Sequence, residues 1–525
     1  MLDRLKPFHW QLLLVMLGLL AYSRAPMGRY VYDDIHVIKE NHHLDEWASL
    51  GALFSEDYGS TFGELSYRPL VSLSYFVDVK IFGRNPFWSR LFNVFLHLGV
   101  GLGLFTLWKR LFDDQLLAFF AAALFLVHPI TTEVVLSPGF REELLAALAT
   151  VGALILFTRA VREESVLHGC LGVLVWFFGL LSKETSMVAL GLAPMLLLRF
   201  GPRKLRRPRG KLPKAILVTA VAVALALILF FIMYLSFRPD QEAGYVAWHA
   251  QRGAQGFATP DPGDSPWPGG KGPALGFLNF TGTLLTYARL WLVPHPLSIN
   301  HWYQASREYT DIRLWVGLWL LVLALTLSAW GYYRGSTLGA GGLWALICLA
   351  PLSQIIPTPE LLAERYLYFP HMGLALVLAS LMLATKEARA SFARDSRLLR
   401  HGLLSAILLL YITLALARTE DWRFNVALNI RAYEQWNNSY GDTILAEIFL
   451  HHGRNADAAA AARQAILRNP TYDEPYRVLG VLHLRAGRPE EALPLFEKAL
   501  QLDPDDTRNR KAVQEARRNM ENRDP

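Results

Sequence analysis

The sequence AILVTAVAVALALILFFIMYLSF, residues 215–237, contains no charged side chain over 23 consecutive positions. A helix needs about 20 predominantly apolar residues to cross the hydrocarbon core of a bilayer, so this stretch predicts a transmembrane helix. Residues 199–214, directly before it, are dense in Lys and Arg. Such a basic segment is typical of a loop on the cytoplasmic side. The stretch therefore predicts an integral membrane protein, and the basic segment before it predicts that residues 199–214 are cytoplasmic.

The composition also indicates a membrane protein. Of the 525 residues, 53% are hydrophobic and only 18% are charged, which is unlike a soluble chain. Ten further apolar runs predict an all-α, polytopic fold with about eleven transmembrane helices. Residues 1–22 are interpreted as a retained anchor, with a cleaved signal peptide as the alternative. The ten runs are Trp10–Tyr22, Arg90–Trp108, Gln115–Val127, Leu144–Phe157, Val166–Leu181, Ser186–Leu198, Leu314–Tyr333, Gly341–Ile356, Pro370–Ala384 and Leu403–Ala417.

Charge and cysteine content argue against two other classes of protein. The formal charge of +7 comes largely from short basic runs between apolar segments. These runs indicate topology rather than a surface for nucleic acid, so no nucleic-acid partner is expected. Cys170 and Cys348 each lie inside an apolar run. This placement argues against a disulfide framework and a thiolate metal site.

Basic residues occur at every second junction between apolar runs, which places these junctions and the N-terminus in the cytoplasm. The alternate loops, including residues 23–89 and 238–311, are then outside, in the periplasm of a bacterial-type inner membrane. If Ala274–Val293 spanned the bilayer, every later loop would invert, so an interfacial or re-entrant helix is expected there. The basic junctions are Lys109-Arg110, Arg159–Arg162, Arg199–Lys214, Arg334 and Lys386–Arg400.

The outer loops mix acids with bases. Asp33 and Asp34 follow Tyr32 in the first outer loop. A carboxylate held partly out of water can accept a proton from an attacking hydroxyl, whereas the alternative is a solvated turn or a helix N-cap. Snorkelling at helix ends accounts for some of the other charges, but not for acids and bases together at several loops of one face. These further charges are Arg68, Glu133, Arg141, Glu143, Lys183, Glu184 and Arg365.

Residues 421–525 contain two copies of a 34-residue period, residues 437–470 and 471–504, which end at Pro470 and Pro504. This period and its pattern of small and large residues are those of tetratricopeptide repeats, which stack helix pairs into an α-solenoid. Residues 506–520 would cap the stack. Two repeats form a short concave surface suited to an extended peptide or a partner protein, and packing against the membrane domain is the alternative. Matching positions in the second copy are Tyr476, Leu479, Gly480, His483, Ala492, Phe496, Ala499 and Pro504.

Several stretches taken together resemble the GT-C superfamily of membrane glycosyltransferases. The nearest likeness is to the transmembrane, tetratricopeptide-containing O-mannosyltransferases and their bacterial relatives, with residues 1–420 as the catalytic domain. The residues that carry the resemblance are Tyr32-Asp33-Asp34, Tyr67-Arg68-Pro69-Leu70, Phe82-Gly83-Arg84-Asn85-Pro86-Phe87, Arg90 to His97, His128-Pro129 with Thr132-Glu133, Arg141-Glu142-Glu143-Leu144-Leu145, Ser182-Lys183-Glu184-Thr185 and Ala363-Glu364-Arg365-Tyr366-Leu367-Tyr368-Phe369-Pro370.

The resemblance implies roles for individual residues. Asp33 would be the catalytic carboxylate with Asp34 as its neighbour, and Arg68, Lys183 and Arg365 would bind the donor phosphate. Phe140 stands where relatives usually have Gly before the Arg, and Glu143 stands where they have Asp, so the reach of this acid differs from the family pattern. The remaining site candidates are Tyr32, Glu133, Arg141, Glu143, Glu184 and Tyr366.

The resemblance also implies the reaction. The enzyme would transfer one sugar, with inversion, from a polyprenyl phosphate to an acceptor outside the cytoplasm; a protein Ser or Thr hydroxyl is favoured over a lipid or a glycan. No cofactor is expected, although Asp33, Glu133 and Glu143 could in principle bind a divalent metal. The rival hypothesis is a non-catalytic membrane scaffold for the repeats. A transporter is disfavoured because no matched pair of Gly- or Pro-interrupted helices is present in two halves.

Overall fold

The computed structural model describes residues 6–51, 53, 67–200, 214–237, 272–301, 303–356, 358, 360–383, 394–504 and 506–521, and over these ranges every regular element is helical. Parts of the predicted outer loops, residues 54–66 and 238–271, and of two basic junctions, residues 201–213 and 384–393, lie outside the description. The chain divides into two compact units. The first holds the described residues up to 297 and 303–425, and the second holds residues 298–301 and 426–521.

The first unit is a helix bundle, and each of the eleven apolar runs coincides with a helix. The helices of this unit are α1 (Pro7–Ala21), α3 (Pro69–Phe82), α4 (Pro86–Phe112), α5 (Gln115–Val127), α6 (Thr132–Leu136), α7 (Arg141–Arg162), α8 (Val166–Leu180), α9 (Ala189–Phe200), α11 (Lys214–Phe237), α13 (Pro273–Leu292), α14 (Ile312–Tyr333), α15 (Thr337–Leu349), α16 (Tyr368–Leu383) and α18 (Arg394–Asp421). The all-α prediction is therefore confirmed.

The predicted count of eleven spans is not confirmed. Within the described residues, six helices are long and apolar enough to cross a membrane, and a seventh span results if α5 and residues 129–136, which meet at a bend of 53°, count as one. Several other apolar runs form shorter helices, such as α1 and α8 with 15 residues each. The 20-residue α13 does not meet the same test of length and composition. The six are Pro86–Phe112, Pro138–Arg162, Lys214–Ser236, Ile312–Tyr333, Glu364–Leu383 and Leu399–Asp421.

Local sequence explains the sharp turns between the early helices. Pro69 begins α3, and Gly83 ends it with a positive φ of 66° that side chains with a β-carbon rarely adopt. Asn85 then caps α4 by accepting a hydrogen bond from the backbone N–H of Phe87. At the far end of α4, Asp114 caps α5 by accepting from the N–H of Leu117 at 3.1 Å. Adjacent helices are thus joined by short, well-capped turns.

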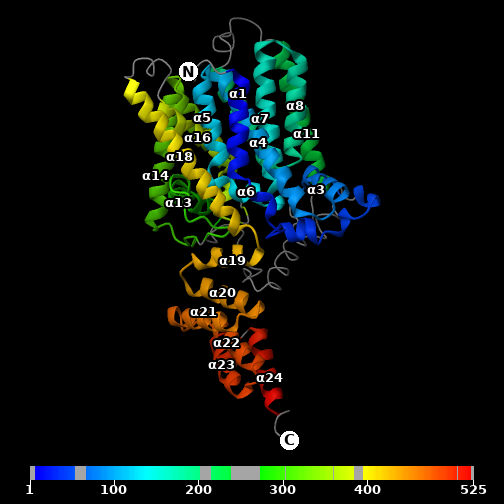
Figure 1. The fold of residues 1–525 in the computed structure, drawn as a ribbon, viewed down its shortest axis with the longest axis vertical. Helices are drawn as coiled ribbons and strands as arrows, with labels where there is room; N and C mark the ends of the chain where they lie inside the picture. Colours follow the sequence, from blue (N-terminus) through cyan, green and yellow to red (C-terminus); the bar gives the residue numbers. More distant parts are fainter. Residues whose placement is uncertain are drawn as a thin grey trace. The chain divides into compact units, whose positions relative to one another are not determined.

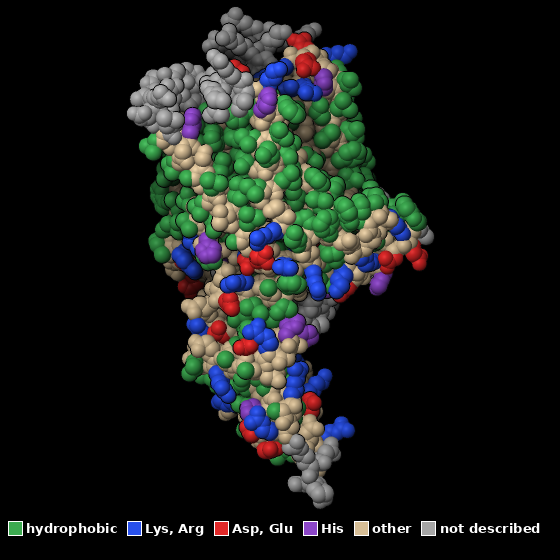
Figure 2. Space-filling model, in the orientation of Figure 1, with side chains coloured by type: hydrophobic (Ala, Val, Ile, Leu, Met, Phe, Trp, Pro, Cys, Tyr) green, Lys and Arg blue, Asp and Glu red, His purple; other side chains and the backbone are tan. Residues whose placement is uncertain are grey.

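Helix α5 is the core of the bundle. All its residues from 117 to 127 are buried, and the helix packs against α1, α4, α16 and α18. Four of these residues are alanines, which let neighbouring helix backbones approach closely in an apolar environment. By contrast, α11 and α14 expose most of their apolar side chains. Figure 2 shows hydrophobic side chains over the visible face of the bundle and charged residues gathered at its two ends.

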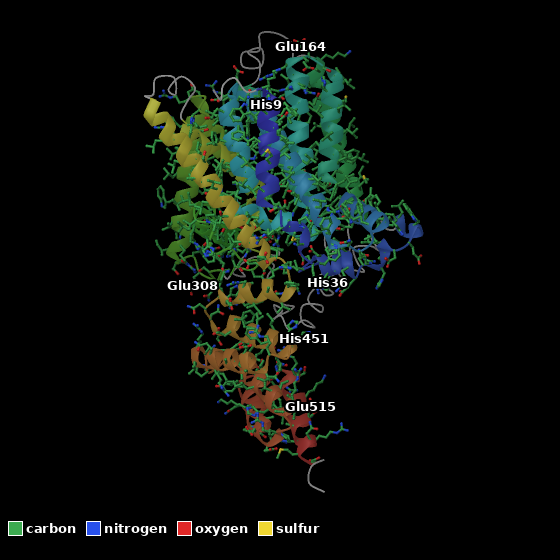
Figure 3. All side chains as sticks on the ribbon, viewed as in Figure 1. His9, His36, Glu164, Glu308, His451 and Glu515 are labelled. Carbon is green, nitrogen blue, oxygen red and sulfur yellow. The ribbon has the colours of Figure 1, made fainter. Side chains whose placement is uncertain are left out.

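The loops of the bundle alternate between its two ends. Figure 3 shows His9 and Glu164 at one end, and His36 and Glu308 at the opposite end. Helix α3 lies at the end that carries His36, opposite to the start of α1 (Figure 1). His36 and Glu308, which belong to the predicted outer loops 23–89 and 238–311, are therefore at one end of the bundle, and Glu164, in the junction after α7, is at the other.

The second unit contains the predicted helix pairs. Helices α20 (Ser439–His451) and α21 (Asn455–Arg468) form the first pair, and α22 (Glu474–Arg485) and α23 (Pro489–Leu502) form the second, with α19 (Asn425–Glu434) before them and α24 (Thr507–Glu521) after them. Ala458 and Ala462 are fully buried between the first two pairs of helices. The Phe496 ring is fully buried and lies against Gly480, where a β-carbon would collide with it. Small residues opposite large ones thus interlock the pairs.

We expect Phe496→Ala to lower the stability of the repeats by about 3–5 kcal/mol, because it removes a fully buried ring and leaves a cavity. Leu467→Ala is the control, since Leu467 is 79% exposed on α21 and its loss should change stability by less than about 0.5 kcal/mol. Thermal unfolding of the purified chain, followed by limited proteolysis of residues 426–521, measures both effects. Equal effects of the two substitutions would contradict this packing.

Candidate active site

The acidic pair of the first outer loop lies in an unusual turn. Tyr32 has a φ of 52°, in the left-handed region that aromatic residues rarely occupy. Its backbone N–H donates a hydrogen bond to Asn425 Oδ1 at 2.9 Å. A single turn of helix, Ile35–Lys39, follows. Non-glycine residues with positive φ are enriched at functional sites, where surrounding contacts hold them in place.

Asp34 is buried and fully engaged. Its Oδ1 accepts hydrogen bonds from Ser137 Oγ and from the backbone N–H of Gly139, both at 2.6 Å, and its Oδ2 accepts from the N–H of Val31 at 3.1 Å. Burial raises the pKa of Asp34, while the nearby Arg90 and these hydrogen bonds oppose the rise. At Gly139, a β-carbon would lie 3.1 Å from Asp34 Oδ1, so the close approach needs glycine. Asp34 therefore ties the first loop to the turn before α7.

Asp33 differs from its neighbour. The carboxylate is half-buried and accepts no hydrogen bond from the residues that the structure describes. Burial raises its pKa to about 7, against the attraction of Arg365; Glu360, Asp34 and Glu142 raise the pKa further. A carboxylate with a pKa near neutrality that no hydrogen bond holds is suited to exchanging a proton.

Arg68 and Lys183 form a charged cluster with three glutamates. Arg68 precedes α3, Lys183 follows α8, and the first turn of α7 supplies Glu142 and Glu143. Lys183 Nζ donates to Glu143 Oε1 at 2.6 Å and to Glu142 Oε1 at 3.3 Å. Arg68 contacts Glu142 Oε1 and Glu184 Oε2, both at 3.4 Å. Two predicted phosphate-binding residues, two further site candidates and Glu142 therefore lie in contact.

Arg365 is the centre of a second charged cluster. Its Nη1 and backbone N–H donate to the two carboxylate oxygens of Glu133 at 2.7 and 2.8 Å, and its Nη2 donates to Glu360 at 2.7 Å. The guanidinium lies over the rings of Phe140 and Tyr366, 4.7 and 5.3 Å from their centres. Such cation–π contacts hold the planar group in one orientation. Two further predicted candidates, Glu133 and Tyr366, thus position Arg365.

Both clusters affect the pKa of Asp33. Arg365 lowers this pKa, whereas Glu360 of the same cluster and Glu142 of the other cluster raise it. Of the three predicted phosphate-binding cations, Arg365 thus acts directly on Asp33, while Arg68 and Lys183 contact Glu142. Phe140 contributes in an unexpected way, because its ring lies against both Tyr32 and Arg365. Glycine at position 140 would lack this contact.

Arg141 occupies a different environment from the other candidates. It is fully buried and donates to Asp78 Oδ2 at 2.6 Å and to Asn93 Oδ1 at 2.9 Å, with further bonds to Ser74 and to the carbonyl of Ser89. These partners belong to α3 and α4. Arg141 thus ties the start of α7 to two neighbouring helices. Within the described residues it forms no hydrogen bond or ion pair with either charged cluster.

Sequence reasoning missed two acids of the site. Glu142 was quoted only as part of the Arg141-Glu142-Glu143 motif, and Glu360 lies in the loop before Glu364-Arg365 and was not considered. A weak signal existed for Glu142, because the first turn of a helix places three consecutive side chains around one helix end. For Glu360 we find no comparable signal in the sequence.

Metal binding was considered for Asp33, Glu133 and Glu143. Over the described residues, Glu133 and Glu143 each pair with a cation. The acids whose oxygens approach one another closely enough to share an ion are instead Asp473, Asp503 and Asp506, in the repeats. Independence from metal at the candidate active site stays a prediction.

Family comparisons define the class of protein that this chain resembles. The family model described as dolichyl-phosphate-mannose-protein mannosyltransferase matches residues 69–234, and the model described as tetratricopeptide repeat matches residues 445–507. The first match runs from the start of α3 into α11 and includes Glu142 and Lys183, and it begins one residue after Arg68. The second covers most of the two helix pairs. The resemblance to membrane glycosyltransferases of the GT-C type that carry such repeats is confirmed.

Individual relatives agree with these matches. The human protein O-mannosyl-transferase TMTC1 is 26% identical over 68% of this chain and 44% of its own length, and mouse TMTC3 is 25% identical over 81% and 48%. This chain thus covers less than half of each of these curated relatives. Among solved structures, the oligosaccharyltransferase of Archaeoglobus fulgidus, tethered with an acceptor peptide, aligns with a TM-score of 0.43 and 12% identity over 86% of this chain and 59% of that one.

We expect Asp34→Ala to destabilise the bundle by about 3 kcal/mol, because it strands the buried Ser137 hydroxyl and Gly139 N–H and removes the charge beside Arg90. Asp33→Asn should change stability by less than about 0.5 kcal/mol, since no hydrogen bond from the described residues is lost. The unfolding midpoint of each purified variant in detergent measures the difference. If both substitutions were equally harmful, the contrast between the two acids would be wrong.

Proposed function

We propose that this protein is an integral-membrane glycosyltransferase that transfers a hexose, with mannose as the first candidate, from a polyprenyl phosphate to a protein Ser or Thr hydroxyl. The observation that carries the proposal is the environment of Asp33. Its half-buried carboxylate accepts no hydrogen bond from the described chain and has a pKa of about 7, which Arg365 lowers and Glu142, a partner of Arg68 and Lys183, raises. The names of the relatives, protein O-mannosyl-transferases, support the acceptor class and the sugar.

The proposed reaction is a direct displacement. The acceptor oxygen forms a bond to the anomeric carbon while the bond from that carbon to the phosphate oxygen breaks. The proton of the hydroxyl passes to the Asp33 carboxylate, and the electron pair of the broken bond leaves with the polyprenyl phosphate. One base opposite one leaving group inverts the anomeric centre, as in inverting glycoside hydrolysis.

The cations of the site act on the leaving group. Arg68 and Lys183 can donate to phosphate oxygens, and Arg365 adds a third positive charge near Asp33. Arg presents a planar fork of donors that suits phosphate, and Lys acts as a compact point charge. Charge that develops on the phosphate in the transition state is stabilised by donors already in place. Lys183 is held at 2.6 Å by Glu143 and Arg365 at 2.7 Å by Glu133, so neither needs to reorganise greatly.

Membrane topology supplies the remaining elements of the proposal. A polyprenyl tail would stay in the bilayer between the helices, while the sugar reaches the end of the bundle that carries His36 and Glu308. We place this end in the periplasm of a bacterial-type inner membrane, with the N-terminus in the cytoplasm, following the basic junctions. The repeats would present the acceptor polypeptide or recruit a partner that delivers it.

Asp33→Asn should lower turnover by about 10²- to 10⁴-fold, because the amide cannot accept the proton of the acceptor hydroxyl. Donor binding should persist, since Arg68, Lys183 and Arg365 are unchanged. The measurement is release of lipid phosphate by purified protein from a panel of polyprenyl-phosphate sugars, with an acceptor peptide present.

Asp45→Asn is the matched control for this experiment. Asp45 is an exposed acid of the same loop that pairs with Arg84, and its loss should leave turnover at the wild-type level. An active Asp33→Asn protein would refute the role of Asp33. If the wild type released lipid phosphate from no donor of the panel, the scaffold hypothesis would replace the enzyme.

The rate of transfer should rise as pH increases through about 7. The sign follows from the raised pKa of Asp33: below pH 7 most molecules hold the protonated carboxyl, which cannot act as a base, and above it the carboxylate predominates. The initial rate between pH 5 and 9 tests this, with the unfolding midpoint recorded at each pH as a control. A rate that stays level between pH 5 and 9, as a base with the ordinary Asp pKa of about 4 would give, would show that the site does not shift the pKa of Asp33.

A further inference from the structure

The cations of the candidate active site are already matched with carboxylates. Arg68 contacts Glu142 and Glu184, and Lys183 contacts Glu142 and Glu143. Arg365 likewise contacts Glu133 and Glu360. An anionic group that binds these cations must therefore displace at least one carboxylate, or bind as an additional anion beside the carboxylates. The geometry of the existing ion pairs indicates which carboxylate is displaced.

Glu142 is the acid that the two cations share. Its Oε1 lies 3.4 Å from Arg68 Nη1 and 3.3 Å from Lys183 Nζ. Its side chain is 8% exposed, and those of Lys183 and Arg68 are 10% and 19% exposed. A single oxygen atom thus lies between the two cations, at the edge of the protein interior. A phosphate oxygen that bridges Arg68 Nη1 and Lys183 Nζ would take nearly the same position.

The contacts of Glu142 are longer than that of Glu143 with Lys183. Charge-assisted hydrogen bonds between nitrogen and oxygen are typically about 2.7–2.9 Å long. The Lys183–Glu143 pair, at 2.6 Å, is shorter than this range, whereas both contacts of Glu142 and the contact of Arg68 with Glu184 exceed it. Glu184 contacts only Arg68 of the two cations, so Glu142 is the weakly held acid that both share. Because hydrogen bonds weaken with distance, Glu142 is held less firmly by Lys183 than Glu143 is.

We infer that Glu142 competes with the phosphate of the lipid-linked donor for Arg68 and Lys183, so that it is displaced when the donor binds and returns when the lipid phosphate leaves. This inference rests on the proposed function, because it takes the two cations as the phosphate site. Glu142 then has no bond to make or break in the reaction. It keeps the cations compensated in the empty site and promotes release of the anionic product.

The competition predicts an effect opposite in sign to that of a structural role. If Glu142 only held the cations in place, its removal would weaken phosphate binding. If it competes with phosphate, its removal strengthens binding. The fold should tolerate the change, since Lys183 keeps Glu143 and Arg68 keeps Glu184 as partners. Gln has the same shape as Glu and can still accept hydrogen bonds, so Glu142→Gln isolates the charge.

The test measures equilibrium binding of undecaprenyl phosphate and of uncharged undecaprenol to the purified full chain. Wild type, Glu142→Gln, Glu142→Ala and the control Glu163→Gln are compared; Glu163 is an exposed acid at the opposite end of α7. Both Glu142 variants should bind the phosphate about tenfold more tightly, the effect of losing one competing charge-assisted contact. Binding of undecaprenol should not change in any variant.

The same variants should show the effect in turnover. Inhibition of sugar transfer by added undecaprenyl phosphate should strengthen about tenfold in Glu142→Gln, while Glu163→Gln behaves as wild type. Weaker or unchanged phosphate binding in both Glu142 variants, with unfolding midpoints like that of the wild type, would overturn the competition and leave the proposed enzyme intact. If the wild type neither binds undecaprenyl phosphate nor transfers a sugar, the proposed function itself fails and this inference with it.

Discussion

The need to pair every charge that an apolar helix bundle buries governs the organisation of the site. Removing an ion from water costs several kcal/mol unless a partner of opposite charge or a set of hydrogen bonds replaces the lost hydration. In this bundle, Arg141 pairs with Asp78, Lys183 with Glu143, and Arg365 with Glu133. Each pair joins segments that are distant in the sequence. The pairing therefore also determines how the helix ends come together at one end of the bundle.

Against this background, Asp33 is exceptional. It is close to cations and other acids, yet no hydrogen bond from the described residues holds its carboxylate. Its neighbour Asp34 has three such bonds and serves to close the loop. Two identical side chains, adjacent in the chain, thus lie in different surroundings after the turn at Tyr32. Asp34 holds the loop in place, and the Asp33 carboxylate takes no part in that.

Features that form a regular pattern along the chain could be predicted from the sequence. Apolar runs indicated eleven of the helices of the first unit, and the 34-residue period indicated the helix pairs of the second unit. The number of spans was harder to predict, because runs such as those of α1 and α8 fold as helices of 15 residues whose crossing of a bilayer depends on their neighbours. Length and hydropathy report on one helix at a time, whereas tilt and depth depend on packing.

The candidate site was predictable as a set of residues but not as a set of contacts. Motifs indicated Asp33, Arg68, Lys183 and Arg365. In the structure Arg68 and Lys183 share Glu142, and Arg365 and Glu142 both affect the pKa of Asp33. They could not show that Arg141 and Glu142, one position apart, face different surroundings, since this depends on how α7 is rotated against α3 and α4. Nor could they identify Glu360, whose contact with Arg365 arises from the path of a loop.

The contact that closes the first loop lies at Gly139, a residue without a β-carbon. Its N–H donates to the Asp34 carboxylate, and a methyl group there would press on both the backbone and the carboxylate of that acid. Positions 34 and 139 are more than one hundred residues apart, yet a change at one of them affects the packing of the other. A shorter residue at position 34 would leave space for a β-carbon at position 139, so the two positions should tolerate change as a pair more readily than singly.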